Sequence, residues 1–426
     1  MPHDANDALA RLPFLTEGVP PISGAIKRRY EDFHVVEVPL YEPCGEGTHC
    51  YVRIEKRGLA TMRAVHDVAR ALGRSARDIG VAGLKDARGV TVQTLSIEHV
   101  DPEQVRALDI PRIRVLEVSL HRNKLRIGHL RGNRFRIRLR EADPDRLPDV
   151  RAICEVLGSR GVPNYFGRQR FGLRGDTGRI GRAVLMGDHK TVVDLTLGRA
   201  GPSDTGDVLR ARRLYDAEDY AAAADAWPRG FRDNARACRA MAQSHGNHRR
   251  AYHTLDARLR RLFVNAFQSE LFNDVLAERI GDIDRVRAGD VAWKHDNGAT
   301  FLVEDAEAEG PRATAFEISP TGPIFGPRMA QPAGEIAALE ALILADSGVT
   351  LADFNSVPGA KVQGTRRPLR FRPEGLEIDA ADDSHGPFIE LAFTLPSGCY
   401  ATMVLREVCK HELKEGLSEE GAVETA

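Results

Sequence analysis

The sequence predicts an α+β protein with much antiparallel sheet and a helical middle section. Short runs in which apolar and polar residues alternate fill much of the first 140 positions. From about residue 190 the chain becomes rich in Ala and Arg, which favour helices, and strand-like runs return near residue 370. The two ends of the chain therefore share one character, and the middle has another.

The first half contains strand-like runs around one clear helix. HVVEVPL and HCYVRI, separated by Pro and Gly, predict a hairpin or two neighbouring strands. Apolar residues then recur at helical spacing over 61–73, where Thr61 is placed to cap the helix and Gly73 to end it. VTVQTLSI, RIRVLEVSL and RFRIRLR predict three further strands, and 144–161 predicts a helix.

The second half begins with helices. The runs at 217–227 and 254–281 have helical composition, and the longer one carries an apolar stripe that ends before Gly281. Short strands are expected over 289–330, and a strand, a turn and a helix over 386–408. We expect the acidic tail beyond Lys410 to fray.

Composition excludes several classes of protein. The 426 residues suggest two or three domains, and 60 Lys and Arg against 61 Asp and Glu, with 42% hydrophobic residues, are typical of a globular chain rather than a disordered or collagenous one. Six scattered cysteines, none in a CxxC pair, predict neither a disulfide framework nor a zinc site. No signal peptide or membrane span is recognisable. We expect a cytoplasmic protein.

Cations are concentrated in three segments despite a net charge of −1. Residues 121–140 contain eight Lys or Arg and no acid, 228–261 nine Arg and two Asp, and 361–372 five cations and no acid. In RFRIRLR a strand would place all its arginines on one face, where Arg134, Arg136 and Arg138 could follow a phosphate backbone. A solvated face is the alternative for each cluster.

Two segments have unusual local chemistry. In AGLKDARG a tight loop presents Asp86 between Lys85 and Arg88, and neighbouring positive charge keeps a carboxylate ionised, as a carboxylate nucleophile requires. In VPNYFGRQRFG, aromatic, amide and cationic residues lie between glycines, which suits a flipped base. Each pattern also occurs in plain surface turns.

Other catalytic patterns are missing from the sequence. His245, His248 and His253 lie close together but without HExxH or a Cys/His quartet, so a metal site is not expected. GxSxG, GxxxxGK[ST] and a strand-borne GxGxxG are also absent, which argues against hydrolase triads and nucleotide-dependent motors.

Several motifs together resemble one family, the tRNA pseudouridine synthases of the TruD type, whose eukaryotic relatives are the pseudouridine synthase 7 proteins. In chain order they are IKRRYEDFHVVE, AGLKDARGVTVQ, HLRGNRF, NYFGRQRFG and LPSGCYATMVLRE. The resemblance spans nearly the whole chain. It implies a pseudouridine synthase catalytic domain with a mixed, mainly antiparallel sheet, formed by 1–189 and 368–426, and an inserted α/β domain, special to the family, at 190–367.

The resemblance also implies roles for individual residues. Asp86 stands where the family has its catalytic aspartate, and Lys27 where it has a nearby basic residue. Four residues are implied to bind the target nucleotide, namely Phe33, Asn164, Phe166 and Tyr400. Phe166 would stack on the uracil, Asn164 would hydrogen-bond the base or ribose, and Phe33 and Tyr400 would wall the pocket. A purely core role is the alternative for each of the three rings.

The activity implied is isomerisation of a specific uridine of tRNA, position 13 in bacterial members, to pseudouridine without cofactor or metal. We expect a monomer whose partner is tRNA. Two rivals stay open: a non-catalytic RNA-binding protein, and a carboxylate-dependent N-glycosidase, which usually needs a second acid. Glu31, Asp32 and Glu37 are loose candidates for that acid.

Overall fold

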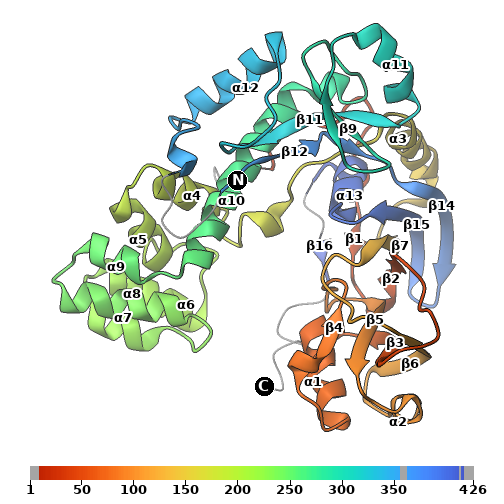
Figure 1. The fold of residues 1–426 in the computed structure, drawn as a ribbon, viewed down its shortest axis with the longest axis horizontal. Helices are drawn as coiled ribbons and strands as arrows, with labels where there is room; N and C mark the ends of the chain where they lie inside the picture. Colours follow the sequence, from red (N-terminus) through yellow and green to blue (C-terminus); the bar gives the residue numbers. More distant parts are fainter. Residues whose placement is uncertain (1–8, 356–361, 412–413, 417–426) are drawn as a thin grey trace. The chain divides into compact units, whose positions relative to one another are not determined.

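Two compact units make up the computed structural model, which describes residues 9–355, 362–411 and 414–416 (Figure 1). The helical unit comprises Met1–Leu15 and Pro163–Arg370, and the sheet unit comprises Thr16–Val162 and Phe371–Ala426. The chain thus leaves the sheet unit once and returns to it. The return lies close to the predicted boundary near 368, and the departure lies before the predicted 190. The assignment of 1–189 and 368–426 to a catalytic domain stays a prediction.

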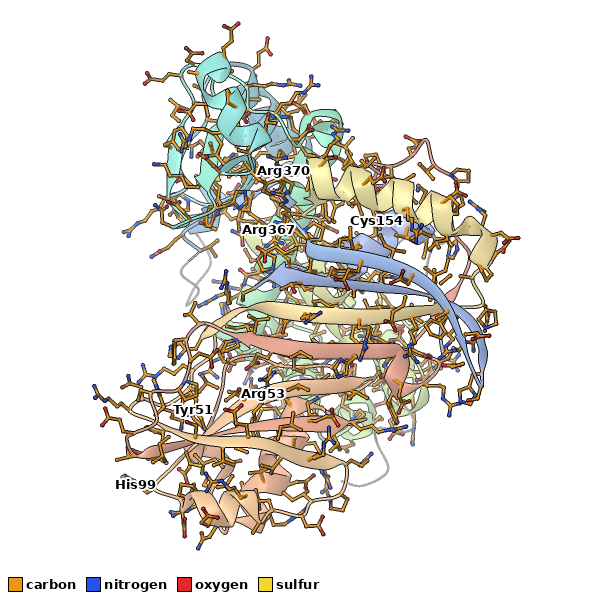
Figure 2. All side chains as sticks on the ribbon, turned by 90° about the vertical axis from the view of Figure 1, so that its right-hand side faces the viewer. Tyr51, Arg53, His99, Cys154, Arg367 and Arg370 are labelled. Atoms are coloured by element: carbon orange, nitrogen blue, oxygen red, sulfur yellow. The ribbon has the colours of Figure 1, made fainter. Side chains whose placement is uncertain are left out.

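The sheet unit is built on one large sheet, whose long strands lie side by side in Figure 2. Across the sheet these are β14 (Glu374–Asp383), β15 (Gly386–Pro396), β7 (Leu130–Arg140), β2 (Phe33–Pro39), β5 (Val90–Glu98), β3 (His49–Arg57) and β6 (Ile113–His121). Three short strands join it, β1 (Ala25–Ile26), β4 (Ile79–Val81) and β16 (Lys414–Glu415). The pairs β2–β5 and β1–β16 are parallel and the other described pairs are antiparallel. The predicted mixed, mainly antiparallel sheet is confirmed.

The expected pairing of the first two strand-like runs is wrong. β5 lies between β2 and β3, so that Thr91 is opposite Val35 on one side and opposite Lys56 on the other. Alternation of apolar and polar residues indicates that a segment is a strand, but it does not indicate which strand will be its neighbour. The partner of both runs comes from a segment more than 30 residues later in the chain.

The three helices predicted in the sheet unit are present, as α1 (Thr61–Ala71), α3 (Leu147–Arg160) and α13 (Ala401–Cys409), together with α2 (Pro102–Arg106). Apolar residues of α1 pack against Ile54 and Leu95 in a buried core. The predicted cap is wrong: Ala60 is the N-cap residue, and the Thr61 hydroxyl instead contacts the loop before β5.

The helical unit has a four-stranded sheet in the order β10-β9-β11-β12. Its helices are α4 (Thr177–Leu185), α5 (His189–Leu197), α6 (Gly206–Asp216), α7 (Tyr220–Ala226), α8 (Arg232–Gln243), α9 (His248–Thr254), α10 (Ala257–Glu278), α11 (Ala306–Thr314) and α12 (Gly334–Asp346). Its strands are β9 (Val291–Lys294), β10 (Thr300–Leu302), β11 (Ile318–Ile324) and β12 (Thr365–Pro368). The predicted long helix is α10, and the expected short strands over 289–330 are β9, β10 and β11. Helix α11 between them was not predicted.

The chain passes between the units within two short strands, β8 (Val162–Pro163) and β13 (Arg370–Phe371). In the described ranges, no helix combines the length and the apolar character needed to cross a bilayer. Most of the tail expected to fray lies outside the described residues.

Candidate active site

The loop that carries Asp86 connects β4 to β5 and is anchored on both sides. The Thr61 hydroxyl, at the start of α1, accepts a hydrogen bond from the Lys85 backbone N–H at 2.7 Å and is 2.9 Å from the Gln93 side-chain oxygen. Lys56 of β3 donates through Nζ to the Asp86 backbone carbonyl at 3.1 Å. Elements on either side of the loop therefore fix its backbone.

The Asp86 carboxylate is bound through both oxygens. Oδ2 accepts a hydrogen bond from Lys27 Nζ at 2.7 Å, and Oδ1 accepts one from the Arg88 backbone N–H at 3.0 Å. Burial opposes ionisation of the group, but Lys27 and Arg88 together hold the pKa of Asp86 below its ordinary value. The side chain is still 34% exposed. Asp86 is thus an ionised carboxylate that a ligand can reach.

Lys27 and Phe33 form one side of this site. Lys27 has a left-handed backbone conformation, with φ of 53°, and its side chain is only 7% exposed. Its ammonium group lies 4.6 Å from the centre of the Phe33 ring, which packs edge-on against Phe135. The structure therefore brings together three of the predicted or implied features: the aspartate, the basic residue and an aromatic wall.

Gly89 lets the loop approach β2. A Cβ atom at position 89 would lie 2.4 Å from the Phe33 carbonyl oxygen, which is closer than a side chain tolerates. Only glycine permits this contact. The glycine at the end of AGLKDARG thus places Asp86 beside Lys27 and Phe33.

Two further lysines, Lys56 of β3 and Lys85 of the loop itself, are buried near Asp86 and were not predicted as site residues. Lys56 is 1% exposed, and burial lowers its pKa to about 8. Lys85 is paired with Glu37 at 2.8 Å, both side chains being buried. No local motif marks Lys56, because it reaches the site only through the pairing of β3 with β5.

None of the three candidate second acids is free among the described residues. Glu37 is paired with Lys85, Asp32 with Arg140, and Glu31 with Arg57. Each of these carboxylates is thus already engaged by a cation of the protein. These ion pairs weaken the glycosidase alternative.

Asn164 and Phe166 belong to the helical unit and are almost fully buried, at 2% and 7% exposure. The Asn164 amide donates to the Pro368 carbonyl at 2.8 Å and accepts from the Arg367 guanidinium. That guanidinium also lies over the Phe166 ring, 4.3 Å from its centre (Arg367 is labelled in Figure 2). Phe272 packs edge-on against the same ring at 5.5 Å. The implied roles of Asn164 and Phe166 toward a base stay predictions.

Tyr400 lies in the sheet unit as the N-cap residue of α13 and is 37% exposed. It is therefore not the core tyrosine that was the alternative interpretation. Its exposure is compatible with a pocket wall, and that role stays a prediction.

The predicted arginine row lies on the opposite face of the sheet from Phe33. Arg134 and Arg136 of β7 are paired with Val36 and His34 of β2, whereas Phe135 and Ile137 are paired with Val35 and Phe33. Paired residues point to the same side of a sheet, and successive residues of a strand point to opposite sides. Arg134 and Arg136 are exposed.

The third arginine of the row, Arg138, is already bound by acidic side chains. Arg138 is paired with Glu390 at 2.9 Å and with Asp383 at 3.3 Å, and it stacks on Phe388. The expected phosphate contact therefore has only two exposed members in this strand. In the described part of the chain, no group of three or more His, Cys, Asp or Glu side chains is placed to hold a metal ion.

Comparisons with known proteins agree on one family. The family model for tRNA pseudouridine synthase D (TruD) matches residues 12–408. The chain is 48% identical over 397 residues to the tRNA pseudouridine synthase D of Geobacter sulfurreducens, covering 93% of this chain and 96% of the relative. It is 45% identical over 398 residues to that of Geotalea daltonii, covering 93% and 99%. A solved structure from Methanosarcina mazei, described as tRNA pseudouridine synthase D, superposes with a TM-score of 0.83 at 26% identity, over 97% of this chain and 99% of that one.

Proposed function

The chain belongs to the tRNA pseudouridine synthase D family, and we propose that it isomerises uridine 13 of tRNA, with Asp86 as the catalytic carboxylate and with no cofactor. The resemblance noted in the sequence is thereby confirmed, and the target position and the mechanism are our proposal. A monomeric state and a cytoplasmic location also stay predictions.

The observation that supports this mechanism best is the state of Asp86. It is ionised, bound by Lys27 through one oxygen, and reachable from outside. Phe33 adds an aromatic wall next to the carboxylate. A carboxylate that acts on a sugar or a base must be unprotonated and close to an apolar surface that excludes water.

The reaction needs no external reagent. The N1–C1′ glycosidic bond of uridine breaks, the detached uracil turns in the pocket, and a C5–C1′ bond forms. C5 loses its proton and N1 gains one, so atoms and electrons balance within the nucleoside. The protein has to bind the extruded nucleotide, retain the free uracil and move one proton.

Asp86 has three possible points of action. It can attack C1′, attack C6 of the base, or assist removal of a proton from C2′. In each case Lys27 keeps the carboxylate ionised and oriented before reaction. Phe33, Phe166 and Tyr400 supply faces or edges for the uracil, and Asn164 supplies an amide for the base or ribose.

Two tRNA transcripts test the target position. Incubation with an unmodified transcript should produce one pseudouridine at position 13, and a transcript with cytidine at position 13 should produce none. Pseudouridine at another uridine would contradict the proposed position without contradicting the reaction.

Measurement of free uracil in the same reactions tests the main rival. An N-glycosidase would release uracil and leave an abasic site, whereas an isomerase releases none. A protein that binds the transcript but yields neither product would be the non-catalytic RNA-binding protein.

A further inference from the structure

A cavity of about 460 Å³ lies in the sheet unit, outside the residues assigned to the target uridine. Three rings line it, those of Tyr41, His121 and His129. Tyr41 is stacked on His121, with ring centres 5.1 Å apart and planes at 21°, and its hydroxyl is 2.7 Å from His129 Nδ1. The volume falls within the range of about 300–1,000 Å³ that is usual for ligand sites.

The rings are fixed from below by β3. Tyr51 packs against His121 with ring centres 4.8 Å apart, and its hydroxyl donates to the Asn123 backbone carbonyl at 2.9 Å. Tyr51 is 4% exposed, and Figure 2 shows its position on the strand. The aromatic surface therefore does not need to be assembled when a ligand arrives.

The rim of the cavity is mostly cationic and polar. The lining includes Asn123, Lys124 and Arg126, with Glu42 as the acidic member. Arg126 is exposed, and Lys124 donates to the Arg77 carbonyl at 2.7 Å. These residues belong to the segment 121–140, which has eight cations and no acid. Aromatic faces with cations beside them are the combination that binds a nucleotide of single-stranded RNA.

The cavity is close to the catalytic loop. Ala82, at the start of that loop, packs in one apolar cluster with Tyr51 and Leu125, and Tyr41 packs against this cluster. Asp86 follows Ala82 by four residues, so the Cα atoms of the two residues lie within about 14 Å of each other even if the chain between them is fully extended. A second cavity is lined by Tyr41 and His129, which also line the first, and by Glu37, the ion-pair partner of Lys85 in the loop.

We propose that this cavity binds a second nucleotide of the substrate tRNA, with its base against Tyr41, His121 and His129 and its phosphate beside Arg126. The inference rests on the proposed function and extends it. Such a site would fix the RNA near the target uridine by stacking, which accepts any base, and would leave the choice of uridine to other contacts.

Variants of Tyr41 and Arg126 test the site by equilibrium binding of an unmodified tRNA transcript. Tyr41→Ala should weaken binding by about tenfold, because it removes a stacking face, and Tyr41→Phe should bind like the parent. Arg126→Ala should lower the slope of log K against log salt by about 0.7 to 0.9, one phosphate contact. Arg106→Ala, an exposed arginine of α2 paired with Glu103, is the matched control and should leave the slope unchanged.

Unchanged tRNA affinity in a folded Tyr41→Ala protein, or an unchanged salt slope in Arg126→Ala, would overturn the proposal. If Tyr41→Ala fails to fold, Arg126→Ala still decides, since its side chain is exposed. A further experiment measures binding of AMP and UMP to the parent and to Tyr41→Ala. If Tyr41→Ala loses affinity for these nucleotides but keeps its affinity for tRNA, the cavity binds a free nucleotide instead. Failure of the proposed function looks different, because the parent protein itself would then form no pseudouridine.

Discussion

Lys27 holds Asp86 at a cost in backbone conformation. A lysine with φ of 53° lies in the left-handed region, which costs a non-glycine residue of the order of 1–3 kcal/mol when it is held there. The conformation coincides with a side chain that is buried and bonded to the carboxylate. Strain retained at a residue that bonds the candidate nucleophile supports a functional role for Lys27.

Replacement of Lys27 tests its effect on Asp86. Because Lys27 lowers the pKa of Asp86, Lys27→Met should raise it, and activity should then be lost at higher pH than in the parent as the solution is acidified. The measurement is the single-turnover rate of pseudouridine formation between about pH 3 and pH 8, because the ordinary pKa of an aspartate is about 3.9 and that of Asp86 in the parent lies below it.

Lys27→Arg is the control, because a guanidinium keeps the positive charge. The acidic limb of its pH–rate profile, where the rate falls as the pH is lowered, should stay close to that of the parent even if the overall rate is lower. An acidic limb that is the same in Lys27→Met and the parent would show that Lys27 does not set the ionisation of Asp86.

Several site residues could be predicted from the sequence and others could not. Asp86 and Lys27 are found because family motifs contain them, and Arg88 because it lies two positions after Asp86. Lys56 and Thr61 act through strand pairing and a tertiary hydrogen bond, which no local pattern encodes. Arg367, which contacts both Asn164 and Phe166, is some 200 positions later in the chain and had been noted only as one cation in a cluster.

At the scale of elements, the first turn of α1 supports the loop that carries Asp86. Thr61 was expected to cap this helix, and the structure turns its hydroxyl toward Lys85 and Gln93 instead. The Ala60 N-cap makes no side-chain hydrogen bond to α1. The Thr61 hydroxyl thus bonds the loop instead of capping α1.

Thr61→Val should therefore damage the loop. It keeps the side-chain shape but leaves the Lys85 N–H unpaired in a buried site, which should cost about 1–3 kcal/mol of stability and lower the turnover rate. Denaturant unfolding and single-turnover kinetics check this. Thr91→Val is the matched control on β5: the Thr91 hydroxyl is buried and has no hydrogen-bond partner among the described residues, so its removal should be neutral or stabilising. Equal losses in the two variants would contradict the anchoring role.

Strand β7 shows how far alternation can be trusted. The predicted split of RFRIRLR into an apolar face and an arginine face is observed. The sequence pattern could not show that Arg138 and Arg140 are both paired with Asp383, on β14. Charge density in a segment therefore overestimates the cations free to bind RNA.

The arginines of β7 should separate into two functional groups. The double variant Arg134→Ala, Arg136→Ala should lower the slope of log K against log salt for tRNA binding by about 0.7 to 0.9 per lost phosphate contact. Arg138→Ala should leave that slope unchanged and lower the melting temperature, because Glu390 loses its arginine and Asp383 keeps only Arg140. If the double variant has the same slope of log K against log salt as the parent, Arg134 and Arg136 form a solvated face that does not contact the RNA.

At the scale of the whole molecule, the chain leaves the sheet unit after Val162 and re-enters it at Phe371. The sequence indicates such an excursion through its change of composition and through motifs near both ends. It places the departure near 190 rather than 162, because the first residues of the helical unit, from Pro163, still belong to a motif shared with the family. Amino-acid composition reflects where helices lie, whereas the boundary of a unit depends on which residues contact one another. A change in composition therefore need not coincide with a boundary between units.

The central claim is that Asp86 performs the isomerisation, and one variant tests it most directly. Asp86→Asn removes the negative charge while nearly keeping the volume, and the measurement is pseudouridine formed in an unmodified tRNA transcript under single-turnover conditions, beside tRNA affinity and thermal unfolding of the same sample. Asp86→Glu, in which the carboxylate moves by roughly 1 Å, should lose about a hundredfold in rate. We predict that Asp86→Asn folds, binds tRNA with the parent's affinity and forms no pseudouridine. A folded Asp86→Asn protein that forms pseudouridine at the parent's rate would contradict the account.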